Sequence, residues 1–319
     1  MEDKEWFKIY ETRTKQVKLN MEAIITIVGF LGAGKTTLLK YLINSFIDKG
    51  WNPYIILNDY ENAHIDAQQL TNRVELNSIK ALSGSCICCN GIMELRDTVN
   101  RIPKRPYGIT LIEANGTSDA CTLMEFLGVG LNERFLPPIQ ISVVDVKNWQ
   151  NRGEHNELET NQIQVSSLLV LTHLESSSKS RQTKVRKEIK ELNPYAKIVT
   201  LNDLDISILT ELVPNKNIAK KLDHQKAHWA SCSIDLPKLP NLDCIYEICK
   251  NLPDSILRVK GCTTIGSEED YTYFERTPDG NVSIRPFRGI PITGAKLLTI
   301  GPGSTPSILE HAIETSQNI

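Results

Sequence analysis

The chain has 319 residues, of which 40% are hydrophobic and 23% are charged, and its formal net charge is −2. This composition is typical of a globular protein with two domains, or with one large domain and an appendage. A charge so close to zero gives no sign of the strongly basic surface with which proteins bind nucleic acid or an anionic membrane, so we expect neither partner. Nor does any apolar run approach the ~20 residues of a membrane span.

The first 21 residues are polar and charged, beginning "MEDKEWFKIYETRTKQ". Residues 1–21 are therefore predicted to be a polar N-terminal arm and not a signal peptide. We therefore expect the protein to be cytoplasmic. Thiols stay reduced in the cytoplasm.

A phosphate-binding pattern follows in "ITIVGFLGAGKTTLLKYLI". The apolar run Ile24 to Val28 predicts a buried strand, and Leu38, Leu39 and Leu42 predict a helix after the glycines. This strand–loop–helix context is the one that the pattern G-x-x-x-x-G-K-[ST] requires, because its backbone N–H groups surround phosphate oxygens. Lys35 is predicted to reach the β- and γ-phosphates and the Thr36 hydroxyl to bind Mg²⁺. The predicted nucleotide-binding residues of this loop are Gly29, Gly32, Ala33, Gly34, Lys35, Thr36 and Thr37.

Further apolar runs alternate with helical patterns up to about residue 213. The runs end in polar residues at Asn58, Glu113, Asp145 and Glu175. Alternating strands and helices predict a mostly parallel, doubly wound α/β sheet, here a P-loop NTPase domain over residues 22–213. Ligands of such sheets bind at the carboxyl ends of the strands. The polar residues at those ends are therefore candidates for the site.

The pattern changes after residue 213. Residues 214–227 are polar and rich in lysine, which indicates a linker. Residues 228–319 carry one helical pattern and several alternating runs, two of them joined by "TPDGN", a hairpin-turn sequence. This part is predicted to be a smaller α+β domain with an antiparallel sheet.

The segment "SGSCICCNG" places three of the eight cysteines, Cys86, Cys88 and Cys89, within four residues. Three interpretations compete: buried structural thiols, a redox pair and a thiolate metal site. The flanking Ser, Gly and Asn favour a loop over a core, and the spacing is not the C-x-x-C of redox proteins. Three close thiols without an obvious fourth ligand describe an open metal site, whereas structural zinc is closed by four ligands. The other five cysteines are scattered and are expected in the core.

Taken in order, "GFLGAGKTTLL", "LNDYENAHID", "GSCICCNGIMELRD" and "LIEANG" resemble the motifs of the CobW-like metallochaperone GTPases, and the resemblance covers roughly residues 22 to 302. It implies a GTPase that delivers zinc or cobalt to a client metalloprotein, with GTP, Mg²⁺ and Zn²⁺ (or Co²⁺) as its ligands. The client is not identified by the sequence, and self-association into a homo-oligomer is left open.

The resemblance also implies roles for individual residues. Cys86, Cys88 and Cys89 match the metal-binding cysteines of the family, and Asp59 lies in its first switch segment. Glu113 matches a carboxylate that acts near Mg²⁺ and the attacking water. The predicted catalytic residues are Lys35, Thr36, Asp59 and Glu113, and Gly116 joins the nucleotide-binding set.

The sequence departs from the family pattern at the base-contacting motif, which is usually Asn-Lys-x-Asp. Here it is Thr172-His173-Leu174-Glu175, of which Thr172, His173 and Glu175 are predicted to contact the base. The switch carries Glu61 where the family has glycine, and His64 is a candidate fourth metal ligand. Two other functions stay open: a nucleotide-dependent scaffold with weak or no hydrolysis and relaxed base specificity, and a small-molecule kinase with a redox cluster.

Overall fold

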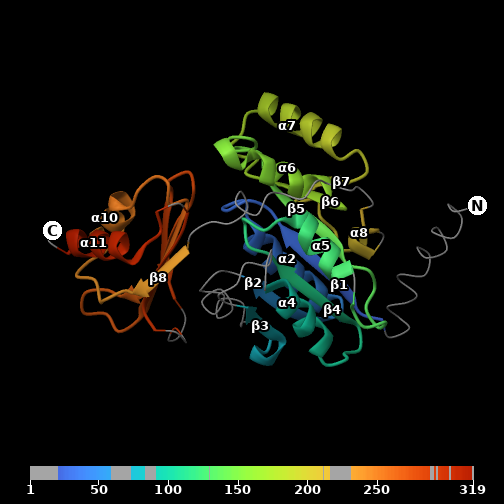
Figure 1. Ribbon diagram of the computed structural model, residues 1–319, viewed down its shortest axis with the longest axis horizontal. Coiled ribbons are helices and arrows are strands. Elements are labelled where there is room, and N and C mark those ends of the chain that lie inside the picture. Colours follow the sequence, from blue (N-terminus) through green and yellow to red (C-terminus); the bar gives the residue numbers. More distant parts are fainter. Residues whose placement is uncertain are drawn as a thin grey trace, which may run out of the picture. The chain divides into compact units, whose positions relative to one another are not determined.

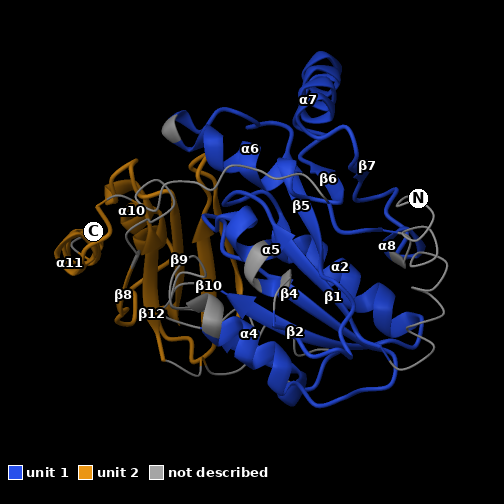
Figure 2. Ribbon diagram, turned by 45° about the vertical axis from the view of Figure 1, so that its right-hand side comes forward, with its two compact units in different colours: residues 1–58, 73–227 blue, residues 59–72, 228–319 orange. Residues whose placement is uncertain are grey.

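The computed structural model describes residues 21–58, 73–82, 91–128, 130–210, 212–215, 231–287, 291, 294–301 and 303–317. These residues form two compact units, one containing the described residues up to 215 and the other those from 231 onwards (Figure 2). None of the helices in these ranges has the length and apolar character that a bilayer crossing requires.

The first unit is built on a seven-stranded parallel sheet (Figure 1). Its order is β3-β2-β4-β1-β5-β6-β7, and every pair of neighbours is parallel. The interior strand β5, next to the central strand β1, is buried along its whole length, as expected where helices cover a parallel sheet. The strands are β1 (Ala23–Val28), β2 (Asn52–Asn58), β3 (Ile79–Leu82), β4 (Gly108–Glu113), β5 (Ile139–Asp145), β6 (Leu168–Thr172) and β7 (Lys197–Thr200).

The helices of this unit follow the strands in alternation. Their bounds are α2 (Lys35–Asp48), α4 (Gly91–Arg101), α5 (Ala120–Gly128), α6 (Asn156–Gln164), α7 (Lys179–Leu192) and α8 (Ser207–Thr210), with 3-10 turns η1 (Leu76–Ser78) and η2 (Gly153–His155). Leu95 of α4 and Leu123 of α5 pack on Ile24 and Ile112 of the sheet. Val185 and other residues of α6 and α7 form a second cluster with β5 and β6. The α/β fold predicted from the sequence is confirmed.

The second unit is a five-stranded antiparallel sheet with two helices. The sheet order is β11-β10-β9-β12-β8. Leu309 of α11 and Ile245 of α10 share one apolar core with Phe274 and Leu297 of the sheet. The bounds are β8 (Ser231–Asp235), α10 (Asp243–Asn251), β9 (Arg258–Thr264), β10 (Tyr271–Arg276), β11 (Val282–Pro286), β12 (Lys296–Ile300) and α11 (Pro306–Ser316). The smaller α+β domain predicted from the sequence is thereby confirmed.

The turn between β10 and β11 is the one that "TPDGN" predicts. The N–H of Thr277 donates to the Asn281 carbonyl at 3.0 Å, and the N–H of Gly280 donates to the Thr277 carbonyl at 2.9 Å. Gly280 has a φ of 83°, a conformation that glycine adopts without a steric penalty.

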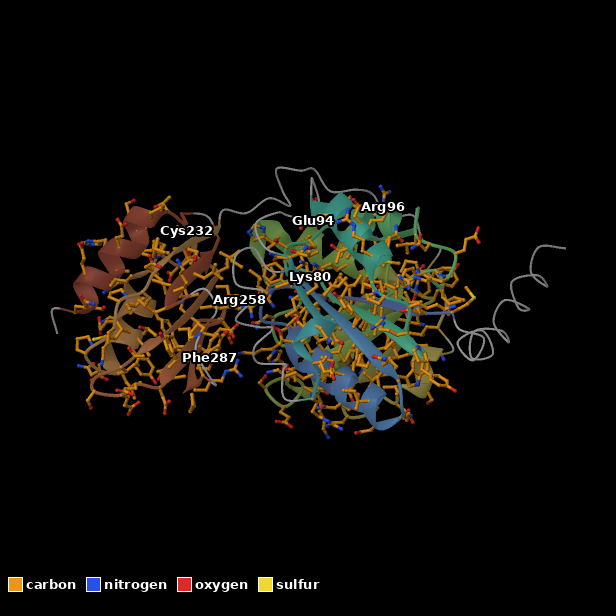
Figure 3. All side chains as sticks on the ribbon, turned by 90° about the horizontal axis from the view of Figure 1, so that it is seen from below. Lys80, Glu94, Arg96, Cys232, Arg258 and Phe287 are labelled. Carbon is orange, nitrogen blue, oxygen red and sulfur yellow. The ribbon has the colours of Figure 1, made fainter. Side chains whose placement is uncertain are left out.

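A charged cluster lies on β9 and β10 of the second unit. The Nη2 of Arg258 is 2.6 Å from the Oε1 of Glu275, and the Tyr273 hydroxyl donates to Oε2 at 3.1 Å. Arg258 and Phe287 of this unit are labelled in Figure 3. Burial by itself raises the pKa of Glu275, but the charges of Arg258 and Lys260 outweigh it and hold the pKa below its usual value.

We expect Glu275→Gln to lower the free energy of unfolding of the second unit by about 3 kcal/mol at pH 7, because it leaves a mostly buried guanidinium without its carboxylate. A depressed pKa in the folded state means that this stability is present above the unfolded pKa and is lost as pH falls through the folded one. The deficit of the variant should therefore shrink between pH 7 and pH 3, as measured by urea denaturation. Asp235→Asn, which affects the carboxylate of an exposed ion pair with Lys296, should change the stability by less than about 1 kcal/mol. An equal deficit of Glu275→Gln at both pH values would contradict the assignment.

Candidate nucleotide and metal site

The loop from Gly29 to Thr36 connects β1 to α2 at the carboxyl edge of the parallel sheet. Gly29 has a φ of 145°, and a Cβ there would lie 2.6 Å from the carbonyl oxygen of Val143 on β5. Gly34 has a φ of 100° at the amino end of α2. Both positions therefore require glycine, the first for close approach and the second for a left-handed conformation. A loop of this shape that leads into a helix N-terminus is an anion-binding geometry.

Lys35 is the first residue of α2 and its side chain turns back over the loop. Its residue surface is only 4% exposed. The Nζ donates to the carbonyl of Gly29 at 2.9 Å and to that of Phe30 at 3.3 Å. The ammonium group is thus held beside the loop backbone, where a phosphate oxygen could accept from it.

Thr36 and Glu113 join the first turn of α2 to the end of β4. The Thr36 hydroxyl donates to the Oε1 of Glu113 at 2.8 Å. The parallel register of β1 and β4 aligns Ile27 with Glu113, which places this carboxylate beside the start of the loop. A hydroxyl and a carboxylate are the oxygen donors that Mg²⁺ prefers, so the donor set fits this cation. Thr37, the next predicted residue, lies exposed in the same helical turn.

The segment after β4 packs directly on the glycine-rich loop. A Cβ at Gly116 would lie 2.6 Å from the Cδ2 of Leu31 and 2.7 Å from its backbone nitrogen. The Asn115 Oδ1 accepts from the N–H of Thr117 at 3.1 Å and from its hydroxyl at 3.2 Å, which holds the turn. The absence of a side chain at Gly116 therefore lets the segment after β4 contact the glycine-rich loop.

The segment after β6 contacts the same loop from its other side. The Thr172 hydroxyl donates to the Ala33 carbonyl at 2.8 Å, and the Nε2 of His173 is 3.1 Å from the Gly32 carbonyl. His173 has a φ of 54°, which is unusual for a residue with a side chain. The hydroxyls of Ser176 and Ser177 donate to its carbonyl. The structure thus brings Thr172 and His173 against the loop, with Glu175 exposed nearby in sequence.

A buried charged network beneath this loop escaped the sequence analysis. Arg152 binds Asp145 at 2.9 Å and Glu159 at 3.3 Å, and all three side chains are at most 7% exposed. The Arg152 guanidinium also lies 4.6 Å from the ring centre of Phe30, in the glycine-rich loop. Burial raises the pKa of Glu159, while Arg152 opposes the shift. The only sequence signal was Asp145 at the end of a buried strand.

Other predicted site residues lie outside the described part of the chain: Asp59, His64, Cys86, Cys88 and Cys89. Within the described ranges no group of three or more His, Cys, Asp or Glu side chains could hold a metal ion. The five scattered cysteines are buried, as expected. Burial raises the pKa of Cys249 and of Cys262 to about 12, although Arg276 opposes it at Cys249. Such thiols do not ionise at neutral pH and so do not serve readily as metal ligands.

The sequence is similar to proteins that handle zinc. The zinc chaperone YjiA of Escherichia coli is 24% identical over 280 residues, which is 81% of this chain and 86% of YjiA. The zinc-regulated GTPase metalloprotein activator 1 of Dictyostelium discoideum is 25% identical over 209 residues, which is 54% of this chain and 44% of that protein. The crystal structure of Zn(II)-bound YjiA GTPase aligns over 93% of this chain and 99% of that one, at 19% identity and a TM-score of 0.42, a similarity too low to support a conclusion.

A family model described as "CobW/HypB/UreG, nucleotide-binding domain" matches residues 23–200, the described part of which contains the loop and both segments that contact it. This match covers more than half of the 319 residues. The resemblance stated from the motifs is confirmed, and the chain belongs to the CobW/HypB/UreG family.

Proposed function

We propose that the protein is a GTP-hydrolysing metal chaperone that binds zinc and delivers it to a client metalloprotein. The observation that carries this proposal is the contact of Thr36 with Glu113 next to the Lys35 ammonium. These three groups suit a nucleoside triphosphate and its cation. Membership of the CobW/HypB/UreG family and similarity to proteins named as a zinc chaperone and as a zinc-regulated GTPase metalloprotein activator support it.

Each residue has a distinct part in the proposed reaction. The loop N–H groups and Lys35 bind the β- and γ-phosphates, and Thr36 and Glu113 are the residues that would hold the cation. Mg²⁺, when bound, would supply positive charge that offsets the negative charge developing on the phosphate oxygens. Glu113 and Asp59 orient the attacking water. Gly116 keeps the loop after β4 close to the phosphates, and Thr172, His173 and Glu175 face the base.

The metal part of the proposal rests on Cys86, Cys88 and Cys89, with His64 as a candidate fourth ligand. Soft thiolates suit zinc, and cobalt is an alternative cargo. The γ-phosphate holds switch segments that relax after hydrolysis, so thiolate geometry and metal affinity change with the nucleotide. We place this cycle in the cytoplasm, with residues 22–213 as the GTPase domain, 214–227 as the linker and 228–319 as the C-terminal domain.

A second candidate function is a nucleotide-binding scaffold with weak hydrolysis and relaxed base specificity. It is favoured by His173, which occupies the place of the family's lysine and is tied to Gly32 in a strained conformation. The imidazole has no long aliphatic stem to pack along a base. The rate of phosphate release separates this candidate from the first.

Lys35→Ala and Thr36→Ala should each lower steady-state GTP hydrolysis by about 10²–10³-fold, because each removes a group that faces developing charge on the phosphates. A phosphate-release assay measures this effect. The matched control is Lys49→Ala, which removes an exposed lysine and its ion pair with Asp205 at the far end of the same helix and should leave the rate unchanged. Hydrolysis at the wild-type rate in either loop variant would show that the site is wrongly assigned.

GTP should bind more tightly than ATP, but by a narrow margin. A bidentate contact to a base edge discriminates by about 1–3 kcal/mol, or about 5- to 150-fold, and the altered motif loses part of it. Competition between GTP, ITP and ATP measures the margin, and His173→Lys should widen it. Equal affinity for all three nucleotides would remove the case for a guanine-specific site and favour the scaffold.

Zinc should bind more tightly with a GTP analogue than with GDP, and zinc should raise the affinity for the analogue by the same factor, about 5- to 150-fold. Cys88→Ser should abolish this coupling and leave basal GTP binding intact, whereas Cys121→Ala, at a buried core cysteine, should preserve both. Zinc affinity should fall below neutral pH because the thiolates must be deprotonated. Titration against a competing chelator tests these outcomes. Identical zinc affinity in both nucleotide states would contradict the switch and indicate a static zinc loop.

A further inference from the structure

A cavity of about 760 Å³ lies in the first unit where β2 and β4 begin. The glycine-rich loop follows the carboxyl end of β1, and β1 runs parallel to β4, so the cavity is at the opposite edge of the sheet. It is separate from the nucleotide site, and the inference drawn from it does not depend on the proposed function. Its size is within the range of small-molecule sites, about 300–1,000 Å³.

The walls of the cavity are rich in rings. Trp51, Tyr54 and Tyr107 line it together with Pro53, Pro103 and Pro106. The Trp51 ring packs edge-on against Phe46 of α2, with ring centres 5.5 Å apart, so it is held in place. Proline fixes the backbone and aromatic rings lose little freedom on binding, so such a wall suits a flat apolar ring.

Two arginines and one acidic residue line the cavity: Arg73, Arg105 and Glu75. Glu22 is fully buried and accepts from Arg105 at 2.8 Å and from Arg134 at 3.0 Å, so one carboxylate serves two guanidinium groups. Arg105 lines the cavity. Burial lowers its pKa, and the contact with Glu22 offsets this only in part. A second anion next to Arg105 would therefore be stabilised.

Arg105 also has hydrogen-bonding capacity left. Besides Glu22, it donates to the Asn52 carbonyl and to the Thr110 hydroxyl. Its Nε is buried and has no partner among the described residues. A buried donor left unpaired is costly, and an anion next to the guanidinium would lower that cost through its charge.

Tyr107 adds a second, independent observation. Its φ is 52°, a conformation that costs a residue with a side chain about 1–2 kcal/mol. Tyr107 lines the cavity and the residue is 54% exposed, so packing offsets little of that cost. Strain of this kind concentrates at functional positions.

We propose that this cavity binds a planar aromatic ligand that carries a carboxylate or phosphate group. The ring packs against Trp51 and Tyr107, and the anion pairs with Arg105 and with Arg73, both of which line the cavity. Arg73 is exposed and its ion pair with Asp48 lies in solvent, so it can exchange partners.

The test uses 2-naphthoate and its neutral isostere 2-naphthamide as probes of the full chain, with binding followed by saturation-transfer NMR and calorimetry. Naphthoate should bind at least about tenfold more tightly, because a hydrogen bond to a charged group is stronger than a neutral one. Arg73→Gln should weaken naphthoate by up to about fivefold and leave naphthamide unchanged. No binding, or equal binding of the two probes, would overturn the proposal.

The variant Tyr107→Gly distinguishes a loss of ligand binding from a loss of stability. Glycine adopts the φ of position 107 without strain, so the variant should be as stable as the wild type or more so. Its naphthoate affinity should nevertheless fall by about 2- to 10-fold, because an aromatic contact is lost. The matched control is Tyr195→Ala, at a tyrosine that is 79% exposed elsewhere in the same unit and should bind as the wild type does. Wild-type affinity in Tyr107→Gly would also refute the site.

Discussion

The close approach of the glycine-rich loop to the strands around it is the constraint on which the candidate site depends. At Gly29 only a hydrogen atom fits against the carbonyl of Val143, and at Gly116 only a hydrogen atom fits against Leu31. Three segments from separate parts of the chain therefore meet within hydrogen-bond distance. Thr36 reaches Glu113 from one side of the loop, and Thr172 reaches Ala33 on the other. A larger residue at either glycine would separate these segments and with them the groups that face the phosphates.

The loop also depends on buried charge. Arg152 lies between Asp145 and Glu159, and its guanidinium contacts the ring of Phe30. Two carboxylates share one cation there, whereas at the other edge of the sheet two cations share Glu22. Buried groups of this kind are costly to separate, because removal of one partner leaves an uncompensated charge. They make the ends of the sheet rigid, and rigid ends keep a site in the geometry that binding requires.

Buried charges are compensated in different ways in the two units. In the first, the buried ion pairs lie near the ends of strands. In the second, Arg258 and Glu275 lie on neighbouring antiparallel strands, two register positions off direct opposition, and Lys260 stands directly opposite Glu275. The opposite charges depress the pKa of Glu275 in spite of its burial. Cross-strand pairing thus supplies the compensating opposite charges in this sheet, whereas residues of helix termini and loops supply them around the glycine-rich loop.

The sequence by itself determined the local features of this protein. The spacing of glycine, lysine and threonine specified the Gly29–Thr36 loop, the apolar runs specified β1, β4 and β5, and "TPDGN" specified a hairpin turn. These patterns are short-range, so residues close in the sequence are enough to predict the local structure. The tertiary structure alone decided which distant residues meet. Glu22 and Arg134 are 112 positions apart. The sequence contains many other acidic and basic residues and does not indicate which of them pair. Only the packing of the elements selects one pair, because a buried charge has to find its partner where the fold brings the two together.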